Sequence, residues 1–315
     1  MPRALVTGGA GFIGSALVRA LAAAGFDARV LDDLSSGSPA NLEGTGAELV
    51  TGDVRDLDLV VGAARGCDVV FHLAAGAGVV ESMNDPLTNF DQNGRGTLTA
   101  LEAARRAEVP RLVFSSSNAP LGENAYPASE DKPVAPLSPY GASKATGEAY
   151  CSAFHGAYGM DAVVVRFSNA YGPRSAHKGN VIPLFIRRLR AGQELVLFGD
   201  GSQTRDFVFC EDLAAGLVAA ATTPEVGGQI FQLASGVETS LARLIELIGE
   251  TAGITPSVRR EPPRQGEIQR NYSLIDKAKT VLGYSPRVEL EEGLRRTWDW
   301  FASAEHPVPG TGSSR

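Results

Sequence analysis

A tyrosine and a lysine four residues apart are the side chains of this sequence best suited to acid–base chemistry. They stand in the segment Tyr140-Gly-Ala-Ser-Lys144, and residues four apart lie on one face of a helix. A free phenol has a pKa of about 10, so it is a poor base at neutral pH unless nearby positive charge stabilises the phenolate. We therefore expect Lys144 to lower the pKa of Tyr140. Such pairs also occur on ordinary helix surfaces, so the surrounding motifs decide their meaning.

Three consecutive hydroxyl residues precede this pair along the chain. The apolar run Leu112–Phe114 predicts a buried strand, and Ser115, Ser116 and Ser117 follow it directly. In a doubly wound sheet, ligands bind outside the carboxyl ends of the strands. We expect Ser117 to hydrogen-bond the same substrate hydroxyl that Tyr140 deprotonates. A turn or a helix cap is the alternative interpretation of such serines.

The start of the chain has the pattern of a dinucleotide site. A short strand at residues 4–6 leads through Gly8, Gly9, Gly11 and Gly14 into a stretch with apolar residues at helical spacing. Glycines without side chains let a pyrophosphate approach the backbone amides, and the amino terminus of the helix favours its negative charge. A glycine cluster on its own also fits an ordinary turn.

An acidic pair follows the second predicted strand, at residues 28–31. Asp32 and Asp33 stand close to the distance along the chain at which a carboxylate meets the adenosine ribose of a bound dinucleotide. A carboxylate accepts hydrogen bonds from the ribose diol but repels a 2′-phosphate. The sequence therefore favours NAD over NADP.

Strand and helix patterns alternate through the first half of the chain. Further strands are expected at residues 48–50, 68–73, 111–114 and 162–167. This alternation predicts an α/β protein with a doubly wound parallel (Rossmann) sheet. Beyond Ser168, glycines and prolines break the chain into short pieces, which favours a smaller α/β substrate-binding lobe.

We expect three parts along the chain. Residues 1–168 form the NAD-binding domain, residues 169–301 mainly the nucleotide-sugar-binding lobe, and residues 302–315 a flexible tail. A helical pattern followed by a strand pattern indicates that segments near 207–235 return to the sheet. A helix over 292–301 is expected to close the fold.

Composition narrows the class of protein. The 315 residues include 43% hydrophobic and 21% charged residues and carry a net charge of −7 without a basic cluster, which argues against nucleic acids and anionic membranes as partners. The apolar stretches are too short to span a bilayer, and residues 1–14 do not resemble a signal peptide, so we expect a cytoplasmic protein. Cys67, Cys151 and Cys210 share no metal-ligand spacing, so we expect reduced thiols and no metal site.

Together these motifs resemble the extended short-chain dehydrogenase/reductase family and, within it, the nucleotide-sugar 4-epimerases. The match runs in order from the glycine segment to Arg166-Phe-Ser-Asn169 and covers nearly the whole chain. The resemblance implies tightly held NAD, with Ser117, Tyr140 and Lys144 as the catalytic residues. The expected NAD-binding residues are Gly8, Gly11, Phe12, Ile13, Gly14, Asp32, Asp33, Ser35, Ser36, Gly37, Asp53, Val54, Leu73, Ala74, Ala75, Tyr140, Lys144 and Phe167.

The resemblance also implies a substrate site in the later part of the chain. Gly179–Pro183 is similar to the segment that receives the sugar diphosphate, and Leu197–Gly199 to the stretch that lines the pyrimidine pocket. Arg205 and Arg264 each offer a forked donor suited to diphosphate oxygens. The expected substrate-binding residues are Ser115, Ser116, Ser117, Asn169, Asn180, Val181, Phe198, Arg205, Arg264 and Glu267.

The implied reaction inverts carbon 4 of a UDP-hexose through a transient 4-keto intermediate. Tyr140 takes the hydroxyl proton while hydride moves to NAD, and the ketone turns about its diphosphate tether before hydride returns. Dehydrating and decarboxylating relatives carry a carboxyl group just after the catalytic hydroxyl residue, where this chain has Asn118-Ala119. A 4,6-dehydratase or a UDP-glucuronate decarboxylase is therefore disfavoured. A non-catalytic NAD-binding regulator is disfavoured because Tyr140 and Lys144 are both retained.

The identity of the hexose is the open point of this interpretation. The serine run and the basic residues Arg174, His177 and Lys178 could serve a carboxylate at carbon 6, which favours the conversion of UDP-glucuronate to UDP-galacturonate. Asn271, which falls where the epimerase pattern lines the sugar pocket, could equally admit other sugars. The alternatives are a UDP-glucose/UDP-galactose 4-epimerase and a UDP-N-acetylglucosamine 4-epimerase.

Two further expectations follow from the resemblance. Family members commonly have a tyrosine just before the glycine of the segment Pro120-Leu121-Gly122, so we expect Leu121 to alter the pocket wall. Dimerisation through a helical bundle is common in the family, so we expect a homodimer.

Overall fold

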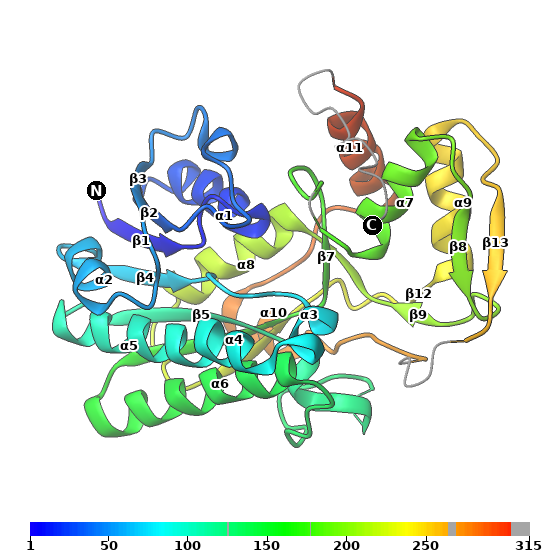
Figure 1. The fold of residues 1–315 in the computed structure, drawn as a ribbon. Coiled ribbons are helices and arrows are strands. Elements are labelled where there is room, and N and C mark those ends of the chain that lie inside the picture. Colours follow the sequence, from blue (N-terminus) through cyan, green and yellow to red (C-terminus); the bar gives the residue numbers. More distant parts are fainter. Residues whose placement is uncertain (125, 177, 264–268, 304–315) are drawn as a thin grey trace.

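A seven-stranded parallel sheet forms the larger part of the molecule (Figure 1). The computed structural model describes residues 1–124, 126–176, 178–263 and 269–303. The strands lie in the order β11-β6-β5-β4-β1-β2-β3, and every neighbouring pair is parallel. Their bounds are β1 (Arg3–Thr7), β2 (Asp27–Asp32), β3 (Glu48–Thr51), β4 (Val69–His72), β5 (Arg111–Ser117), β6 (Asp161–Phe167) and β11 (Ile230–Leu233). The predicted doubly wound α/β fold is confirmed.

Helices cover both faces of the sheet, because side chains alternate along each strand and those of both faces are apolar. Val6 and its neighbours on one face pack in one core with the covering helices, whereas Leu5 belongs to the core on the opposite face. The first face is covered by α1 (Phe12–Ala23), α8 (Cys210–Thr222) and α10 (Asp276–Leu282). The second face is covered by α2 (Leu57–Ala64), α5 (Gly96–Arg106) and α6 (Pro139–Tyr158).

Several connections between strands contain short helical segments. α3 (Val79–Asn84) and α4 (Pro86–Phe90) follow β4, and a π-helical turn at Asp91–Arg95 leads into α5. Two 3-10 segments lie at Pro39–Leu42 and Ala119–Asn124.

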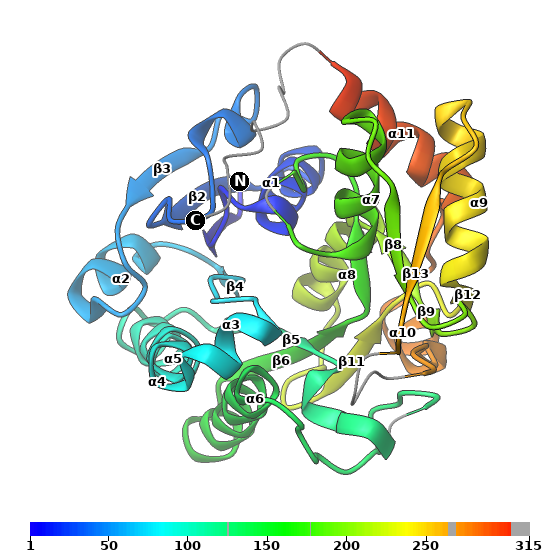
Figure 2. The same ribbon diagram turned by 45° about the vertical axis from the view of Figure 1, so that its right-hand side comes forward.

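The lobe is built from pairs of short strands that join distant parts of the chain, with helices around them (Figure 2). The pairs are β7 (Asn169–Tyr171) with β10 (Phe207–Phe209), β8 (Leu195–Phe198) with β13 (Val258–Glu261), and β9 (Thr204–Arg205) with β12 (Thr239–Ser240). Its helices are α7 (Val181–Arg190), α9 (Leu241–Ala252) and α11 (Leu290–Ala302). A separate apolar core joins these elements.

The chain passes more than once between the sheet and the lobe. It leaves the sheet after β6, returns for α8 and β11, and leaves again toward α9. α11 ends at Ala302, and residues 304–315 of the expected tail lie outside the described residues. In the described part of the chain no helix is long and apolar enough to cross a membrane.

Candidate active site

A cavity of about 790 Å³ lies at the carboxyl edge of the sheet and contains most of the residues expected to bind NAD. Gly37 is the expected NAD-binding residue outside this lining; it lies against Ala10 and Asp32 instead. The expected residues that line the cavity are Gly8, Gly11, Phe12, Ile13, Gly14, Asp32, Asp33, Ser35, Ser36, Asp53, Val54, Leu73, Ala74, Ala75, Tyr140, Lys144 and Phe167.

The glycine loop lies in close contact with the end of β4. Gly8 has a φ of +71°, and a Cβ atom there would lie 2.7 Å from the backbone nitrogen of Ala74. A Cβ atom on Gly14 would lie 2.1 Å from the carbonyl oxygen of Gly8. Both contacts are with backbone atoms, which cannot move aside as a flexible side chain can. Glycine is therefore needed at both positions for the loop to pack beside the amino terminus of α1. This cradle fits the pyrophosphate of a dinucleotide.

Asp32 anchors the glycine loop as well as lining the cavity. Its Oδ2 accepts a hydrogen bond from the backbone nitrogen of Ala10, and its Oδ1 accepts one from Leu34, both at 2.9 Å. Burial raises the pKa of the Asp32 carboxyl group. An ionised carboxylate offers about four acceptor positions, so two remain for a ribose diol.

The Asp53 carboxylate is already paired within the protein. Arg55 binds it through Nε at 3.0 Å and through Nη2, and the same guanidinium pairs with Asp91 of the π-helical turn. This hydrogen bonding holds the pKa of Asp53 below its usual range. Arg55 also lines the cavity, although the sequence analysis did not single it out.

The structure brings Tyr140, Ser117 and Lys144 together beside β5. The side chain of Ser138 caps α6 by accepting a hydrogen bond from Gly141, so Tyr140 lies in the first helical turn. The phenol of Tyr140 lies near Ser117, whose side chain acts to lower the pKa of the phenol. One turn later, Lys144 donates from Nζ to the carbonyl oxygen of Ser115 at 2.8 Å.

The electrostatics of this group differ from the sequence-based expectation. In the protein alone, burial raises the pKa of Tyr140, and the side chain of Ser117 opposes that rise. Burial lowers the pKa of Lys144 to about 8, and the Glu148 carboxylate opposes that fall. In the protein without NAD, the pKa of the phenol is therefore raised rather than lowered as expected from Lys144, because burial is the largest influence on Tyr140 and Lys144 is not among the groups that shift its pKa.

The serines before Ser117 are engaged inside the protein. β5 extends to Ser117, so the serines continue the strand rather than follow it. Ser115 donates from Oγ to the carbonyl oxygen of His72 at 3.1 Å, and Ser116 donates to Glu148 at 2.5 Å. Glu148 in turn forms a buried, bidentate ion pair with Arg166. Ser115 and Ser116 line the cavity, but their hydroxyl groups already have these internal acceptors.

The segment after β4 lines the cavity from residue 76 to residue 82, and residues 77–82 were not expected there from the sequence. The side chain of Asn93 holds it, since its Oδ1 accepts from the nitrogen of Gly76 and its Nδ2 donates to Ser143. Ser82 accepts a hydrogen bond from the backbone nitrogen of Tyr140. The signal that could have found this segment is its place after the carboxyl end of a central strand.

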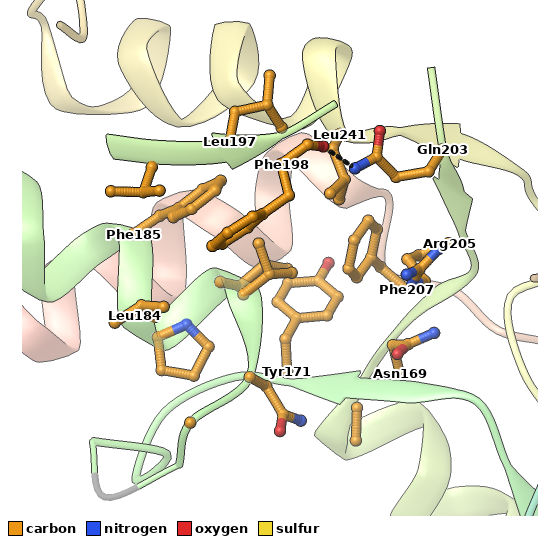
Figure 3. A pocket seen from close by; sticks show the side chains of 17 residues that line it. Asn169, Tyr171, Leu184, Phe185, Leu197, Phe198, Gln203, Arg205, Phe207 and Leu241 are labelled. Atoms are coloured by element: carbon orange, nitrogen blue, oxygen red, sulfur yellow. Dashed lines mark hydrogen bonds between the residues drawn. The ribbon is translucent and has the colours of Figure 1, made fainter. Parts of the chain in front are cut away.

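A second cavity of about 280 Å³ lies in the lobe (Figure 3). Its walls are largely apolar and include Tyr171, Phe185, Phe198 and Phe207. Gln203 donates from Nε2 to the carbonyl oxygen of Phe198 at 2.6 Å, which holds the loop after β8. Gly179 and Asn180 line both cavities, so the two lie next to each other. The expected substrate-binding residues in this lining are Asn169, Asn180, Val181, Phe198 and Arg205.

Asp206 joins the lobe to the edge of the sheet. It is fully buried, and its carboxylate accepts hydrogen bonds from the nitrogen and hydroxyl of Ser235 and from the nitrogens of Gly236 and Ser273. Its carbonyl oxygen accepts from Ser168 and from the backbone and side chain of Asn169. Burial raises the pKa of this carboxyl group. The sequence analysis did not identify this residue.

Leu121 does not alter the cavity wall as the sequence analysis expected. It is buried in a small cluster with Ala128 and Tyr126 and is absent from the lining of both cavities. Tyr126 of the same loop lies near Arg205, whose charge opposes the rise in the pKa of Tyr126 to about 12 that burial causes.

Three residues that the sequence analysis singled out fall outside the described part of the chain. They are His177, Arg264 and Glu267. Asn118, at the position where dehydrating relatives carry a carboxyl group, is buried and donates from its amide to Ser273 at 2.9 Å.

The fold and the Tyr140–Lys144 pair define a nicotinamide-dependent enzyme of the extended short-chain dehydrogenase/reductase type. The model of the NAD dependent epimerase/dehydratase family matches residues 4–234. The chain belongs to this family, and NAD is its cofactor.

Three comparisons with individual proteins cover nearly the whole chain. A UDP-glucose 4-epimerase of Mycolicibacterium smegmatis is 41% identical over 308 residues, which are 95% of this chain and 98% of that protein. The UDP-glucose 4-epimerase of Thermotoga maritima, solved with UDP-glucose, has a TM-score of 0.90 at 35% identity, covering 95% of this chain and 98% of that chain. The UDP-glucuronic acid 4-epimerase of Bacillus cereus, solved with UDP-glucuronic acid and NAD, has a TM-score of 0.87 at 30% identity, with the same two coverages.

Proposed function

We propose that this enzyme inverts carbon 4 of a UDP-hexose through a transient 4-keto sugar. The observation that carries the proposal is the position of Tyr140, which lies near Ser117 and lines the larger cavity, the cavity that shares Gly179 and Asn180 with the lobe cavity. A sugar tethered by a nucleotide in the lobe can reach this phenol. The epimerases that resemble this chain over nearly its whole length support the same assignment.

The cofactor site is proposed along the edge of the sheet. Gly8, Gly11 and Gly14 form the cradle for the pyrophosphate, and Asp32 receives the ribose diol. When bound, NAD supplies the group that accepts and returns the hydride of carbon 4. The remaining steps depend on the protein's own side chains.

Tyr140 is proposed as the base that takes the proton from the 4-hydroxyl group and later returns it. The Ser117 hydroxyl lowers the pKa of the phenol and orients the sugar. Lys144, fixed on the carbonyl oxygen of Ser115, places its ammonium along the same wall. Arg205 and the amino terminus of α7 beside Asn180 are proposed to hold the diphosphate, so that the ketone turns about this anchor.

The chain's own residues favour epimerisation over the other reactions of the family. Dehydration needs an acid and a base beside the serine, but residues 118 and 119 are Asn118 and Ala119, and the Asn118 amide is bound to Ser273. Among hexoses, UDP-glucose is the substrate named for the first two relatives above and UDP-glucuronate for the third. We retain both, and UDP-N-acetylglucosamine, as candidates that a substrate panel separates.

The test is Tyr140→Phe, assayed with UDP-glucose, UDP-glucuronate and UDP-N-acetylglucosamine, each followed for its 4-epimer. Positioned acid–base groups contribute about 10²- to 10⁴-fold, so we expect a loss of that size with the best substrate and unchanged NAD content. Tyr150→Phe is the matched control, because it makes the same change at an exposed position of the same helix. Near-normal turnover by Tyr140→Phe, or a lasting 4-keto-6-deoxy product from the wild-type enzyme, contradicts the proposal.

A homodimer in a reducing compartment, the cytoplasm, completes the proposal. Large apolar side chains are exposed on α3 and α4, which pack against α6: Val80, Met83, Leu87 and Phe90. Such a patch is typical of a protein interface. Light scattering should give twice the chain mass of 33.0 kDa, and Leu87→Glu should shift the mass toward the monomer.

The three cysteines are free and buried, as suits a reducing compartment.

A further inference from the structure

Lys178 is a basic residue of the cavity wall that the reaction scheme above does not use. It lines the larger cavity together with Tyr140 and Lys144. The next two residues, Gly179 and Asn180, line both cavities. Lys178 therefore stands where the sugar and the diphosphate of a substrate must lie if Tyr140 acts on the sugar and the lobe holds the nucleotide.

A hydrogen bond to Ser175 holds the backbone of Lys178. Its nitrogen donates to the carbonyl oxygen of Ser175 at 2.9 Å, and the fully buried Ser175 hydroxyl donates to Gly172 at 2.6 Å. The backbone nitrogen of Lys178 is thus bound to Ser175, and Lys178 lines the cavity.

Within the described part of the chain, no carboxylate pairs with Lys178, and burial is the only influence on its pKa. Burial lowers its pKa, and its charge helps to lower the pKa of Lys144. Two ammonium groups facing one cavity disfavour each other's charged forms, and an anion placed between them relieves this repulsion.

The neighbouring arginine of the same loop does not share this position. Arg174 is absent from the lining of both cavities, and its charge acts on Arg19 and Cys210 beside α1 and α8. Of the basic residues at 174 and 178, only Lys178 faces the cavity that contains Tyr140.

We propose that Lys178 is a substrate-binding residue that holds an oxyanion of the nucleotide sugar beside Tyr140. The inference rests on the proposed function and adds Lys178 as the side chain that recognises a negatively charged group of the substrate in the larger cavity. The oxyanion is either the carboxylate at carbon 6 of a hexuronate or an oxygen of the diphosphate. The first source makes the enzyme selective for UDP-glucuronate, whereas the second makes Lys178 part of the site for every UDP-sugar.

The experiment measures binding to the NAD-loaded enzyme by calorimetry for three ligands: UDP, UDP-glucose and UDP-glucuronate. The variants are Lys178→Met, which keeps the stem and removes the charge, and Lys178→Arg, which keeps the charge. Lys279→Met is the matched control, because Lys279 is exposed on α10 far along the chain from either cavity lining. Loss of a hydrogen bond to a charged group corresponds to a rise in Kd of about 10- to 100-fold.

The pattern over the ligands identifies the oxyanion. Weaker binding of UDP-glucuronate alone in Lys178→Met supports a carboxylate site, and weaker binding of all three ligands supports a diphosphate site. If Lys178→Arg keeps the affinity that Lys178→Met loses, the positive charge at this position is what binds the oxyanion, whether it is a carboxylate or a diphosphate oxygen. Equal binding of all ligands by the wild-type enzyme and Lys178→Met overturns this inference while leaving the proposed function intact. If the wild-type enzyme binds none of the three ligands, both proposals fall.

Discussion

The edge of the sheet and the lobe hold their ligand-facing side chains in different ways. At the edge, short turns that directly follow parallel strands place the residues, and the glycines that mark the first of these turns, Gly8 and Gly14, stand close together in the sequence, although Gly8 also lies against Ala74 after β4. In the lobe, the cavity wall depends on strands that pair across long intervals, such as β8 with β13. The sequence signals of the cofactor half are therefore local, whereas the substrate half is formed by segments that lie far apart in the sequence.

The largest expected effect is the loss of NAD from a variant altered only at the carboxyl edge of the sheet. In Gly14→Ala, the added methyl group meets the Gly8 carbonyl at 2.1 Å, and backbone cannot move aside as a side chain can. Overpacking of this kind costs about 1–3 kcal/mol, and we expect the purified protein to contain no detectable NAD. UDP binding by calorimetry should persist, because the lobe is untouched.

The control for this substitution is Gly62→Ala in α2. A Cβ atom at Gly62 meets no atom within 4 Å, so alanine should stabilise the helix by up to about 1 kcal/mol and leave NAD content unchanged. If Gly14→Ala retains NAD, the cradle is less constrained than its geometry indicates.

The next effect tests the connection between the two regions. Asp206→Ala removes the acceptor of four hydrogen bonds and leaves the buried nitrogen of Ser273 and the partly buried nitrogen of Gly236 without a partner. Each unsatisfied buried group costs about 1–3 kcal/mol, and these costs do not add in full. We expect a lower midpoint of thermal unfolding and UDP binding weakened about 10-fold, with NAD content largely kept.

Asp206→Asn refines the same comparison. Asparagine keeps one acceptor oxygen but turns an amino group toward donors, so it should lie between the wild-type enzyme and Asp206→Ala in both measurements. Loss of NAD before loss of UDP binding in either variant would show that Asp206 serves the edge of the sheet rather than the lobe.

The smallest effect concerns the pH dependence of stability. The pKa of Lys144 is about 8 in the folded protein, against 10.5 in an exposed lysine. Between these values the unfolded chain binds more protons, so the wild-type protein should gain stability relative to Lys144→Met as pH rises from 8 to 10.5. The slope is about 1 kcal/mol per pH unit, measured by denaturant unfolding. A flat difference across this window would mean that the ammonium is not desolvated.

The fold and the cofactor could be predicted from sequence because their signals are local. Strand and helix patterns alternate over short windows, and the glycine segment, Asp32 and the Tyr140–Lys144 spacing each stand within one element or one turn. The family comparison confirms the cofactor, while the roles of individual site residues stay predictions.

The remainder depends on contacts between residues that are far apart in sequence. The residues near Asp206 in the sequence do not predict its hydrogen bonds with Ser235 and Ser273, because these bonds form only when three separate segments meet. The hydroxyl of Ser116 is taken by Glu148, whose position depends on the packing of α6 against β5. The rise in the pKa of Tyr140 likewise depends on burial that no single segment determines.

The repeated passage of the chain between sheet and lobe limits how a new sugar preference can be introduced. Replacing residues 169–301 as one block with the equivalent part of a relative would also remove α8 and β11, which belong to the sheet. Exchange of a smaller block that ends between Asp206 and Ser235, or between Ser235 and Ser273, would separate the Asp206 carboxylate from residues that donate hydrogen bonds to it. Engineering should therefore replace single side chains that line the cavities, such as Lys178, because exchange of the whole block would remove elements of the sheet.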